Sequence, residues 1–466
     1  MSGSANTQPA GPTHASRTDI TDGPITATLL RLAFPTMLVL VVQTLVGVME
    51  TYFVSFLGTE ALAGVTLVFP VLMLMQMMSN GGIGGGVSSA IARALGAKRY
   101  ADADALVWHS IVLAAIFGAV FSTAALIFGP ALYRSMGGTD QTLQAALIYS
   151  GIVFAGAIPI WITALLSAAL RGAGNVGVPA KVIIVGAALL LALSPMLIFG
   201  YGPFPALGVA GGGIAVVIYY VAAAAVLTFY LRGSDKVLKL RIVPLERRLF
   251  KDILGVGIPS AVGTVQVNLT VTFVTAAVGH FGANAIAGFG IASRMDYLQI
   301  PIVFGLGTAI VTMVGTNMGA GKVERAYRIA WSGAAVAFAI TQTIGIVAAL
   351  FPTMWMSLFT KDTNVQELGS LYLQTVAPAY GAVGAGLALY FASQGIKRVL
   401  LPVLAGTVRM ILAAFIGWAS VLWFGASLHT LFLIVSVAAL AYGVLTAAAV
   451  LRHTMSSRPQ ATPRLS

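Results

Sequence analysis

Residues 58–64 read Gly-Thr-Glu-Ala-Leu-Ala-Gly, and residues 282–288 read Gly-Ala-Asn-Ala-Ile-Ala-Gly, an offset of 224 (282 − 58). Further matches follow at nearly the same offset, such as 223 for residues 95 and 318 (318 − 95). They pair Pro35 with Pro259, Leu95-Gly96-Ala97 with Met318-Gly319-Ala320, Trp108 with Trp331, Phe128 with Phe351, and Pro179 with Pro402. Coincidence within an Ala-, Gly- and Val-rich sequence is disfavoured because proline and tryptophan positions match in register. The chain is therefore an internal duplication.

The composition places most of the chain in a membrane. Of its 466 residues 58% are apolar and 9% are charged, with a mean hydropathy of +0.93. A soluble domain carries roughly 25% charged residues, so this surface faces lipid. A bilayer needs about 20 apolar residues per helix, and an open sheet cannot satisfy its backbone there. Twelve apolar runs meet the length, at 29–55, 61–92, 103–128, 141–168, 178–199, 207–231, 252–279, 285–317, 323–350, 365–393, 400–424 and 428–451.

The repeat and the spans together predict the architecture. Six spans per repeat is an even number, so both halves enter the membrane with the same polarity. We expect an all-α integral membrane protein of twelve helices, in two six-helix bundles related by a pseudo-twofold axis along the membrane normal. A cleft between the bundles suits a carrier with alternating access. The expected divisions are a disordered tail (1–25), an N-lobe (26–232), a basic linker (233–251), a C-lobe (252–452) and a C-terminal tail (453–466).

The net charge of +12 follows the membrane topology. Of the 26 Lys and Arg residues, Arg134 and Lys361 fall on one side and Arg294 and Arg409 within spans, which leaves 22 on the other side. The positive-inside rule then places both termini and the linker in the cytoplasm, in a multi-pass protein of the inner (plasma) membrane. No basic stripe interleaved with aromatic residues occurs, so nucleic acid is not expected as a partner. The first 25 residues lack the pattern of a signal peptide.

Several stretches resemble the multidrug and toxic compound extrusion (MATE) family of transporters. These are Pro35 to Gly64 with Gln43-Thr44 and Glu50-Thr51, the repeat copy that ends at 314–322 in Val-Gly-Thr-Asn-Met-Gly-Ala-Gly-Lys, and the segment 168–175 before Pro179. The resemblance covers residues 25 to 450. It implies secondary active efflux of amphipathic, often cationic, organic compounds. The same superfamily includes flippases for lipid-linked saccharides, so the resemblance indicates the fold more closely than the substrate.

The resemblance also implies a cation site, from which this chain departs. The family commonly uses an aspartate in the first helix with an asparagine and an aspartate in the fifth. Glu50 stands at the first position, and Leu190 and Ser194 replace the other two. Neither the seventh nor the tenth span has a carboxylate at membrane depth. We therefore expect protons rather than sodium as the coupling ion, and no cofactor.

Glu50 is the leading candidate for coupling. It lies near the outer end of the first span, with Gln43 seven residues earlier on the same face. An ionised carboxylate at membrane depth is costly, so intramembrane carboxylates usually have a function. When protonated it can hydrogen-bond its neighbours, and when ionised it can attract an organic cation. Proton and substrate would then compete for one group. The alternative is a structural glutamate that reaches the outer interface.

The C-terminal half offers further candidates. Asp296 is a second cation-coupling group, and Arg294 lies two residues away on another face, so the two can also be separate structural anchors. The seventh span carries a polar stripe that either lines the cleft or bonds back to its own helix. The substrate-cavity candidates are Gln43, Thr264, Gln266, Asn268, Thr272, Arg294 and Tyr380.

Other chemistries are disfavoured by the sequence. The glycine cluster at 81–86 has no following Gly-Lys-Ser/Thr, so it indicates close helix packing and no nucleotide site. The five histidines lack ligand spacing, and cysteine is absent, so no metal or catalytic triad is predicted. A lipid-linked saccharide flippase and an intramembrane lipid-modifying enzyme remain as alternatives. The expected partners are small organic cations and membrane lipid, and a monomer already supplies both lobes.

Overall fold

The computed structural model describes residues 20–233 and 237–456, and every regular element in these ranges is a helix. Eleven helices in this part are long and apolar enough to span a membrane, and a pair bent by 50° forms a twelfth span. The predicted all-α fold and the number of spans are therefore confirmed.

The first six spans are formed by nine helical segments. They are α2 (Ile25–Ser55); α3 (Thr59–Met77), which continues through the π-helical η1 (Met78–Ile83) into α4 (Gly84–Gly96); α5 (Tyr100–Ser135); the bent pair α6 (Asp140–Ala155) and α7 (Ala157–Gly172); α8 (Gly177–Phe199); and α9 (Val209–Arg232).

The second six spans contain more breaks. They are α10 (Arg247–Gly279); α11 (Ala283–Ala292) with α12 (Arg294–Gly319); α13 (Val323–Leu350), followed by the short α14 (Pro352–Met356); α15 (Thr363–Val376), η2 (Ala377–Ala379) and α16 (Tyr380–Ile396); α17 (Leu400–Met410), η3 (Ile411–Ile416) and α18 (Gly417–Phe424); and α19 (Leu428–Ser456).

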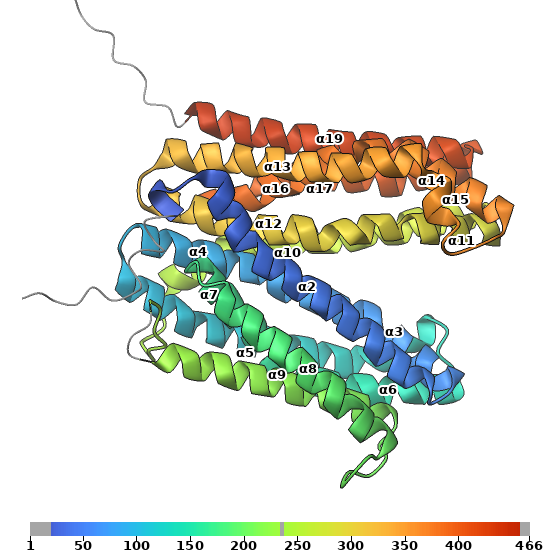
Figure 1. The fold of residues 1–466 in the computed structure, drawn as a ribbon, viewed down its shortest axis with the longest axis horizontal. Helices are drawn as coiled ribbons and strands as arrows, with labels where there is room; N and C mark the ends of the chain where they lie inside the picture. The colour runs from blue at the N-terminus through green and yellow to red at the C-terminus, as the bar shows by residue number, and fades with distance from the viewer. Residues whose placement is uncertain (1–19, 234–236, 457–466) are drawn as a thin grey trace, which may run out of the picture.

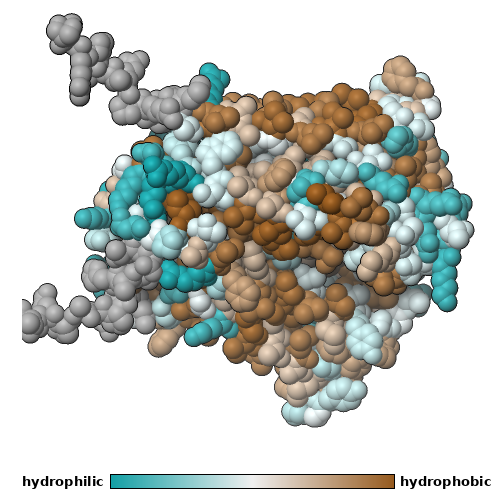
Figure 2. Space-filling view, turned by 45° about the horizontal axis from the view of Figure 1, so that its top comes forward, coloured by the Kyte–Doolittle hydropathy of each residue, from teal (hydrophilic) through white to brown (hydrophobic). Residues whose placement is uncertain are grey.

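The helices form two lobes that lie side by side, with α3 to α9 in one and α11 to α19 in the other (Figure 1). The first helix, the last helix and the connection between the lobes all have an end on the same side of the molecule, which we call the basic end (Figure 1). Figure 2 shows a broad apolar band around the middle of the molecule, with hydrophilic residues toward the ends. This band fits the hydrocarbon core of a bilayer.

Two helices cross between the lobes. The first half of α2 lies in the C-lobe, where Leu29 and Ala33 share a hydrophobic cluster with Leu306 and Ile310 of α12. Its second half packs against α8 of the N-lobe. The helix α10 does the reverse, because its first half packs against η1 and α4 and its later part against α17. The expected division of the chain at residues 26–232 and 252–452 thus describes the halves of the sequence. In the structure, the first half of α2 lies in the C-lobe and the first half of α10 lies in the N-lobe.

The glycine cluster at 81–86 makes this crossing possible. A Cβ on Gly82 would lie 3.1 Å from the Cα of Ala261, and one on Gly86 would lie 2.4 Å from the carbonyl oxygen of Ile253. Both neighbours are on α10, so only glycine lets the two backbones approach this closely. The prediction of close helix packing at this cluster is confirmed.

The segment before α2 is ordered where the sequence predicted a disordered tail. Ile20 is buried in the C-lobe cluster, and its carbonyl accepts a hydrogen bond from Asn317 Nδ2 at 3.0 Å. Asp22 pairs with Lys322, and Arg325 donates to the carbonyl of Gly23. The prediction is wrong for residues 20–25 because one apolar side chain and these polar contacts fix the segment. Residues 1–19 lie outside the described part of the chain.

The connection between the lobes is also fixed, on the N-lobe. Leu238 is buried, Lys239 N donates to Asp104 Oδ1 at 2.8 Å, and Glu246 N donates to His109 Nε2 at 2.8 Å. The helix α10 begins at Arg247, so the last residues of the expected linker are helical. Similarly, α19 extends to Ser456, past the expected start of the C-terminal tail at 453; residues 234–236 and 457–466 are outside the described ranges.

Candidate transport site

Glu50 faces the interior of the N-lobe. Its Oε2 accepts a hydrogen bond from Ser194 Oγ of α8 at 2.9 Å, while Oε1 is shielded from solvent and has no hydrogen-bond partner. Gly212 of α9 leaves the space beside it open, since a Cβ there would lie 3.9 Å from Oε2. These contacts lie inside the lobe, and the choice between a coupling and a structural role for Glu50 stays a prediction. The carboxylate lies between α2, α8 and α9 with one polar contact.

A polar pocket lies in the same lobe and shares α2 with Glu50. Gln43, seven residues before Glu50, lines it together with Gln76, Asn80 and Tyr219. The remaining lining residues are Ser79, Ile160, Thr163, Ala164, Ser167, Ile183 and Tyr220. The lining contains neutral polar groups, aromatic rings and aliphatic side chains, and no charged residue. Sequence reasoning found only Gln43 here; Gln76 and Asn80, four residues apart in an apolar helix, were the signal that it missed.

Asp296 lies near the start of α12 in the C-lobe, among aromatic side chains. Its Oδ2 accepts a hydrogen bond from Tyr372 of α15 at 2.7 Å. Arg409 of α17 is close enough to interact with it electrostatically, and the Arg409 guanidinium lies 5.5 Å from the ring centre of Tyr442. The hydroxyl of Tyr380 also points to Asp296 and interacts with its carboxylate. This carboxylate is thus held between a phenol and a cation.

Arg294 points away from Asp296. Its guanidinium lies 5.5 Å from the ring centre of Phe359, in the segment after α14. The side chain is exposed, at the end of the molecule opposite the basic end. A cation–π contact thus holds the Arg294 side chain, and its place in a substrate cavity stays a prediction.

Most of the polar stripe of α10 bonds back to its own helix. Thr264 donates to Ser260 O at 3.3 Å, and Thr272 donates to Asn268 O at 3.0 Å. Gln266 binds Thr407 of α17 at 2.8 Å, within the C-lobe. Asn268 alone reaches the N-lobe, with its Nδ2 3.8 Å from Met77 Sδ. Of the stripe's candidates, Asn268 is therefore the one that this structure places in contact across the lobes.

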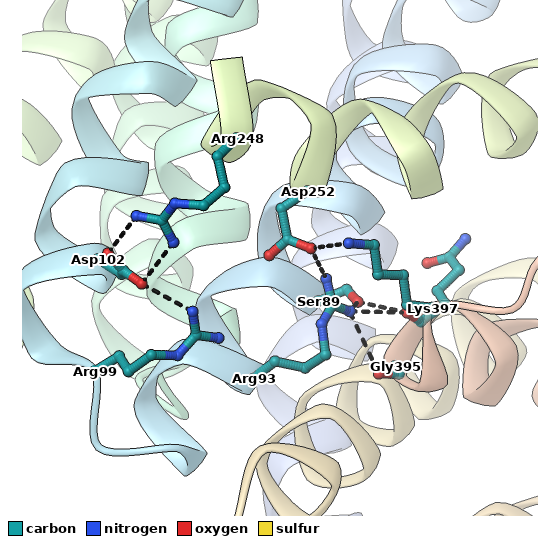
Figure 3. A network of polar contacts seen from close by, with 9 residues as sticks. Ser89, Arg93, Arg99, Asp102, Arg248, Asp252, Gly395 and Lys397 are labelled. Atoms are coloured by element: carbon teal, nitrogen blue, oxygen red, sulfur yellow. Dashed lines mark hydrogen bonds and ion pairs between the residues drawn. The ribbon is translucent and has the colours of Figure 1, made fainter. Parts of the chain in front are cut away.

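The lobes are locked together near the basic end by polar contacts that the sequence did not reveal (Figure 3). Arg93 of α4 pairs with Asp252 of α10 at 3.0 Å, and Lys397 pairs with the same carboxylate. Ser89 donates to the carbonyl of Gln394. Beside them, Asp102 of α5 pairs with Arg248 at 2.9 Å and holds the start of α10 on the N-lobe. The contacts of Lys397 with Asp252 and of Ser89 with Gln394 join the two lobes at this end.

The comparisons with known proteins agree with this arrangement. The MatE family model matches the chain twice, at residues 35–196 and 259–419, which are offset by 224 and 223 positions (259 − 35 and 419 − 196). The chain belongs to the MATE family. It is a multi-pass membrane transporter and not an enzyme, and the internal duplication is confirmed by the two matches.

Individual relatives share the fold along most of their length. The FAD transporter of Shewanella oneidensis is 25% identical over 85% of this chain and 88% of its own. The probable multidrug resistance protein NorM of Thermotoga maritima is 29% identical over 75% of each chain. Among solved structures, a MOP superfamily transporter from Pyrococcus furiosus superposes with a TM-score of 0.87, at 25% identity over 96% of this chain and all of that one. A multidrug resistance MATE transporter in an outward-facing conformation gives 0.83, at 26% identity over 94% and 97%.

Proposed function

We propose that this MATE transporter exports amphipathic, cationic organic compounds in exchange for protons, and that both compete for Glu50. The observation that supports this most is the environment of Glu50: a buried carboxylate oxygen without a partner, beside one hydroxyl group. Such a group can take up a proton or attract a cation, because no ion pair with a neighbouring residue holds it in one of these two states.

A proton suits this site better than sodium. Hard cations are held by several oxygen ligands at once. In the described part of the chain Glu50 has Ser194 as its one hydrogen-bond partner, and no group of three or more His, Cys, Asp or Glu residues could hold a metal ion. One carboxylate oxygen is enough to bind a proton. One carboxylate and one hydroxyl supply too few oxygen ligands for a sodium ion.

In this conformation the pocket has a volume of about 20 Å³, enough for about one water molecule, so substrate binding requires the helices around it to move apart. The chemistry of its lining favours neutral or cationic substrates. Its lining offers Gln43, Gln76, Asn80 and the rings of Tyr219 and Tyr220, and no cation. Several relatives are named as multidrug resistance or export proteins, which fits such a surface. The relative named as an FAD transporter handles an anionic compound, and a flippase for lipid-linked saccharides needs a cationic cavity. Arg294 and Arg409 are engaged with aromatic rings elsewhere, so neither anionic substrate is favoured here.

Alternating access supplies the transport cycle. In this conformation the lobes are joined at the basic end through Arg93, Asp252 and Lys397. Charge distribution predicts that this end is cytoplasmic. Protonation of Glu50 from the outside would release the substrate, and rocking of the lobes would then break the basic-end contacts and return the site inward. One chain contains both lobes, so we expect a functional monomer in the inner (plasma) membrane with cytoplasmic termini.

The test is transport in inverted membrane vesicles under an imposed proton gradient. Wild type should accumulate a fluorescent organic cation, and Glu50→Gln should not, at equal amounts of inserted protein. Glu60→Gln is the matched control, because Glu60 is an exposed carboxylate in the first turn of α3. It should transport like wild type. Uptake driven only by a sodium gradient would overturn proton coupling, and no gradient-driven uptake of the cation by wild type would overturn the exporter and favour the flippase.

A further inference from the structure

A second cavity lies near the basic end of the N-lobe, apart from the transport site. Its volume is about 340 Å³, within the range of roughly 300–1,000 Å³ that is usual for ligand pockets. It lies between α5, α7, α9 and the connection before α10. Its lining includes Trp108, Ile162, Thr228, Arg232, Leu240 and Ile242.

The connection between the lobes forms one wall of this cavity. Leu240 N donates to Leu231 O at 2.7 Å, and the preceding Lys239 N donates to Asp104. Glu246 N is held by the buried ring of His109, whose Nδ1 is 2.7 Å from Ala105 O. These bonds fix an extended segment across the helix ends. Leu240 and Ile242 therefore present a stationary apolar wall rather than a loose loop.

The polar groups of the cavity are all hydrogen-bond donors or hydroxyls. Thr228 and Arg232 lie one turn apart on the same face of α9, and the indole of Trp108 can only donate. None of the three forms a hydrogen bond or ion pair with another described residue, and no acidic residue lines the cavity. The site thus combines an apolar wall with an uncompensated guanidinium at its rim. It complements a ligand with an anionic, acceptor-rich end and an aliphatic body.

We propose that this cavity binds an anionic phospholipid from the leaflet at the basic end. The phosphate lies at Arg232 with Thr228 and the Trp108 indole as further donors, and an acyl chain lies along Ile162, Leu240 and Ile242. Tryptophan and arginine are suited to this depth of the bilayer, and basic pockets between helices on the cytoplasmic side select anionic headgroups. An organic cation is the wrong occupant, because Arg232 repels it.

Native mass spectrometry of the purified full-length protein, titrated with phosphatidylglycerol or phosphatidylcholine, tests the site. Wild type should retain one phosphatidylglycerol molecule about tenfold more tightly than phosphatidylcholine. Both lipids offer a phosphate, but the choline ammonium of phosphatidylcholine cancels the negative charge and is repelled by Arg232, a difference of about one charge-assisted bond. Arg232→Gln should abolish this preference. Thr228→Trp, which fills the cavity, should remove the retained lipid while Arg232 stays in place.

Arg452→Gln is the matched control. Arg452 is exposed near the end of α19, at the same end of the molecule and in the last span of the other lobe, but it does not line this cavity. It should keep the preference of wild type. Equal retention of the two lipids by wild type, or an equal loss in Arg232→Gln and Arg452→Gln, would overturn the proposal. So would one-for-one displacement of phosphatidylglycerol by an organic cation. None of these results depends on whether the protein exports drugs.

Discussion

The two lobes share a fold but not their ionisable groups. At the repeat positions of Glu50 and Ser194 the C-lobe has Val274 (50 + 224) and Gly417 (194 + 223). Val274 is buried in an apolar cluster, and neither of these two positions carries a carboxylate or a hydroxyl. The two halves thus share their helices, but the carboxylate of the first span and the hydroxyl of the fifth span are present in the N-lobe only.

The C-lobe carboxylate is placed differently and has different neighbours. At the repeat positions of Asp296 the N-lobe has Leu72 or Met73 (296 − 224 or 296 − 223). Asp296 is hydrogen-bonded by Tyr372 and lies within the electrostatic reach of Arg409. Glu50 has one hydroxyl and no cation beside it. One oxygen of each carboxylate has no hydrogen-bond partner, so the two sites differ in the cation near Asp296. We infer that Glu50 exchanges its partner, whereas Asp296 holds α12 against α15 and α17.

The largest predicted contrast between the lobes is in transport. Glu50→Gln should reduce proton-driven uptake to background, because it removes a buried carboxylate that has one hydroxyl partner and no ion pair among the described residues. Asp296→Asn should retain uptake within a fewfold of wild type, because its neighbours already compensate the charge. Initial rates in vesicles with matched protein levels measure both. Equal inactivation of the two variants would remove the functional distinction between the lobes.

Stability should show the reverse order. Asp296→Ala leaves the Tyr372 hydroxyl and Arg409 without their partner, so it should lower the free energy of unfolding by about 2 kcal/mol. Glu50→Gln should change it by less than about 1 kcal/mol, since a single hydrogen bond is affected. Denaturation in detergent, followed through tryptophan fluorescence, is the measurement. If Glu50→Gln were the more destabilised variant, Glu50 would be the structural group.

Ser194 sharpens the comparison within the N-lobe. Ser194→Ala removes the one hydrogen bond to the Glu50 carboxylate and should slow transport by about tenfold, short of the complete loss in Glu50→Gln. Ser150→Ala serves as the control, because the Ser150 hydroxyl donates to Leu147 O of its own helix and does not bond to Glu50. An unchanged rate in Ser194→Ala would show that the hydroxyl does not assist the carboxylate.

The smallest predicted effect concerns the ion pairs at the start of α2 and of α10, and it is limited to local hydrogen exchange. Before α2 an acid, Asp22, meets the basic Lys322 of the C-lobe, whereas at the start of α10 the basic Arg248 meets the acidic Asp102 of the N-lobe. The hydrogen bond from Lys322 holds the pKa of Asp22 below its ordinary value of 3.8. The contact is therefore complete above that value and is lost as the pH falls through the lowered pKa.

The protection of the amides of residues 20–23 against hydrogen exchange, relative to their intrinsic rates at each pH, should consequently fall only in strong acid. Asp22→Asn should show the lowered protection at every pH. Because Asp22 is exposed, we expect no measurable change in global stability. Protection factors in wild type that already fall near neutral pH would contradict this contact.

Much of the fold followed from the sequence, because apolar length and the repeat are properties of the chain itself. The pairing of Glu50 with the position of Ser194 was implied by the family resemblance, and the structure places them 2.9 Å apart. Contacts that depend on how the helices cross could not be predicted from the sequence. No pattern near Arg93 indicates that Asp252 is its partner, since that contact requires the first half of α10 to lie in the other lobe.

Local chemistry explains the remaining differences. Arg294 was grouped with Asp296 by sequence proximity, but the helix turns it toward Phe359 at the surface. The threonines of α10 looked like cavity residues because hydroxyls in a membrane need partners, and their own helix supplies them. Ile20 was assigned to a tail by the composition around it, although one buried side chain is enough to anchor a short segment.

The most direct test of competition at Glu50 is the release of protons when substrate binds. Tetraphenylphosphonium added to weakly buffered, detergent-solubilised protein should release close to one proton per bound cation in wild type and in Asp296→Asn. In Glu50→Gln it should release none. Proton release that persists in Glu50→Gln, or that disappears in Asp296→Asn alone, would contradict the account and place the coupling group in the other lobe.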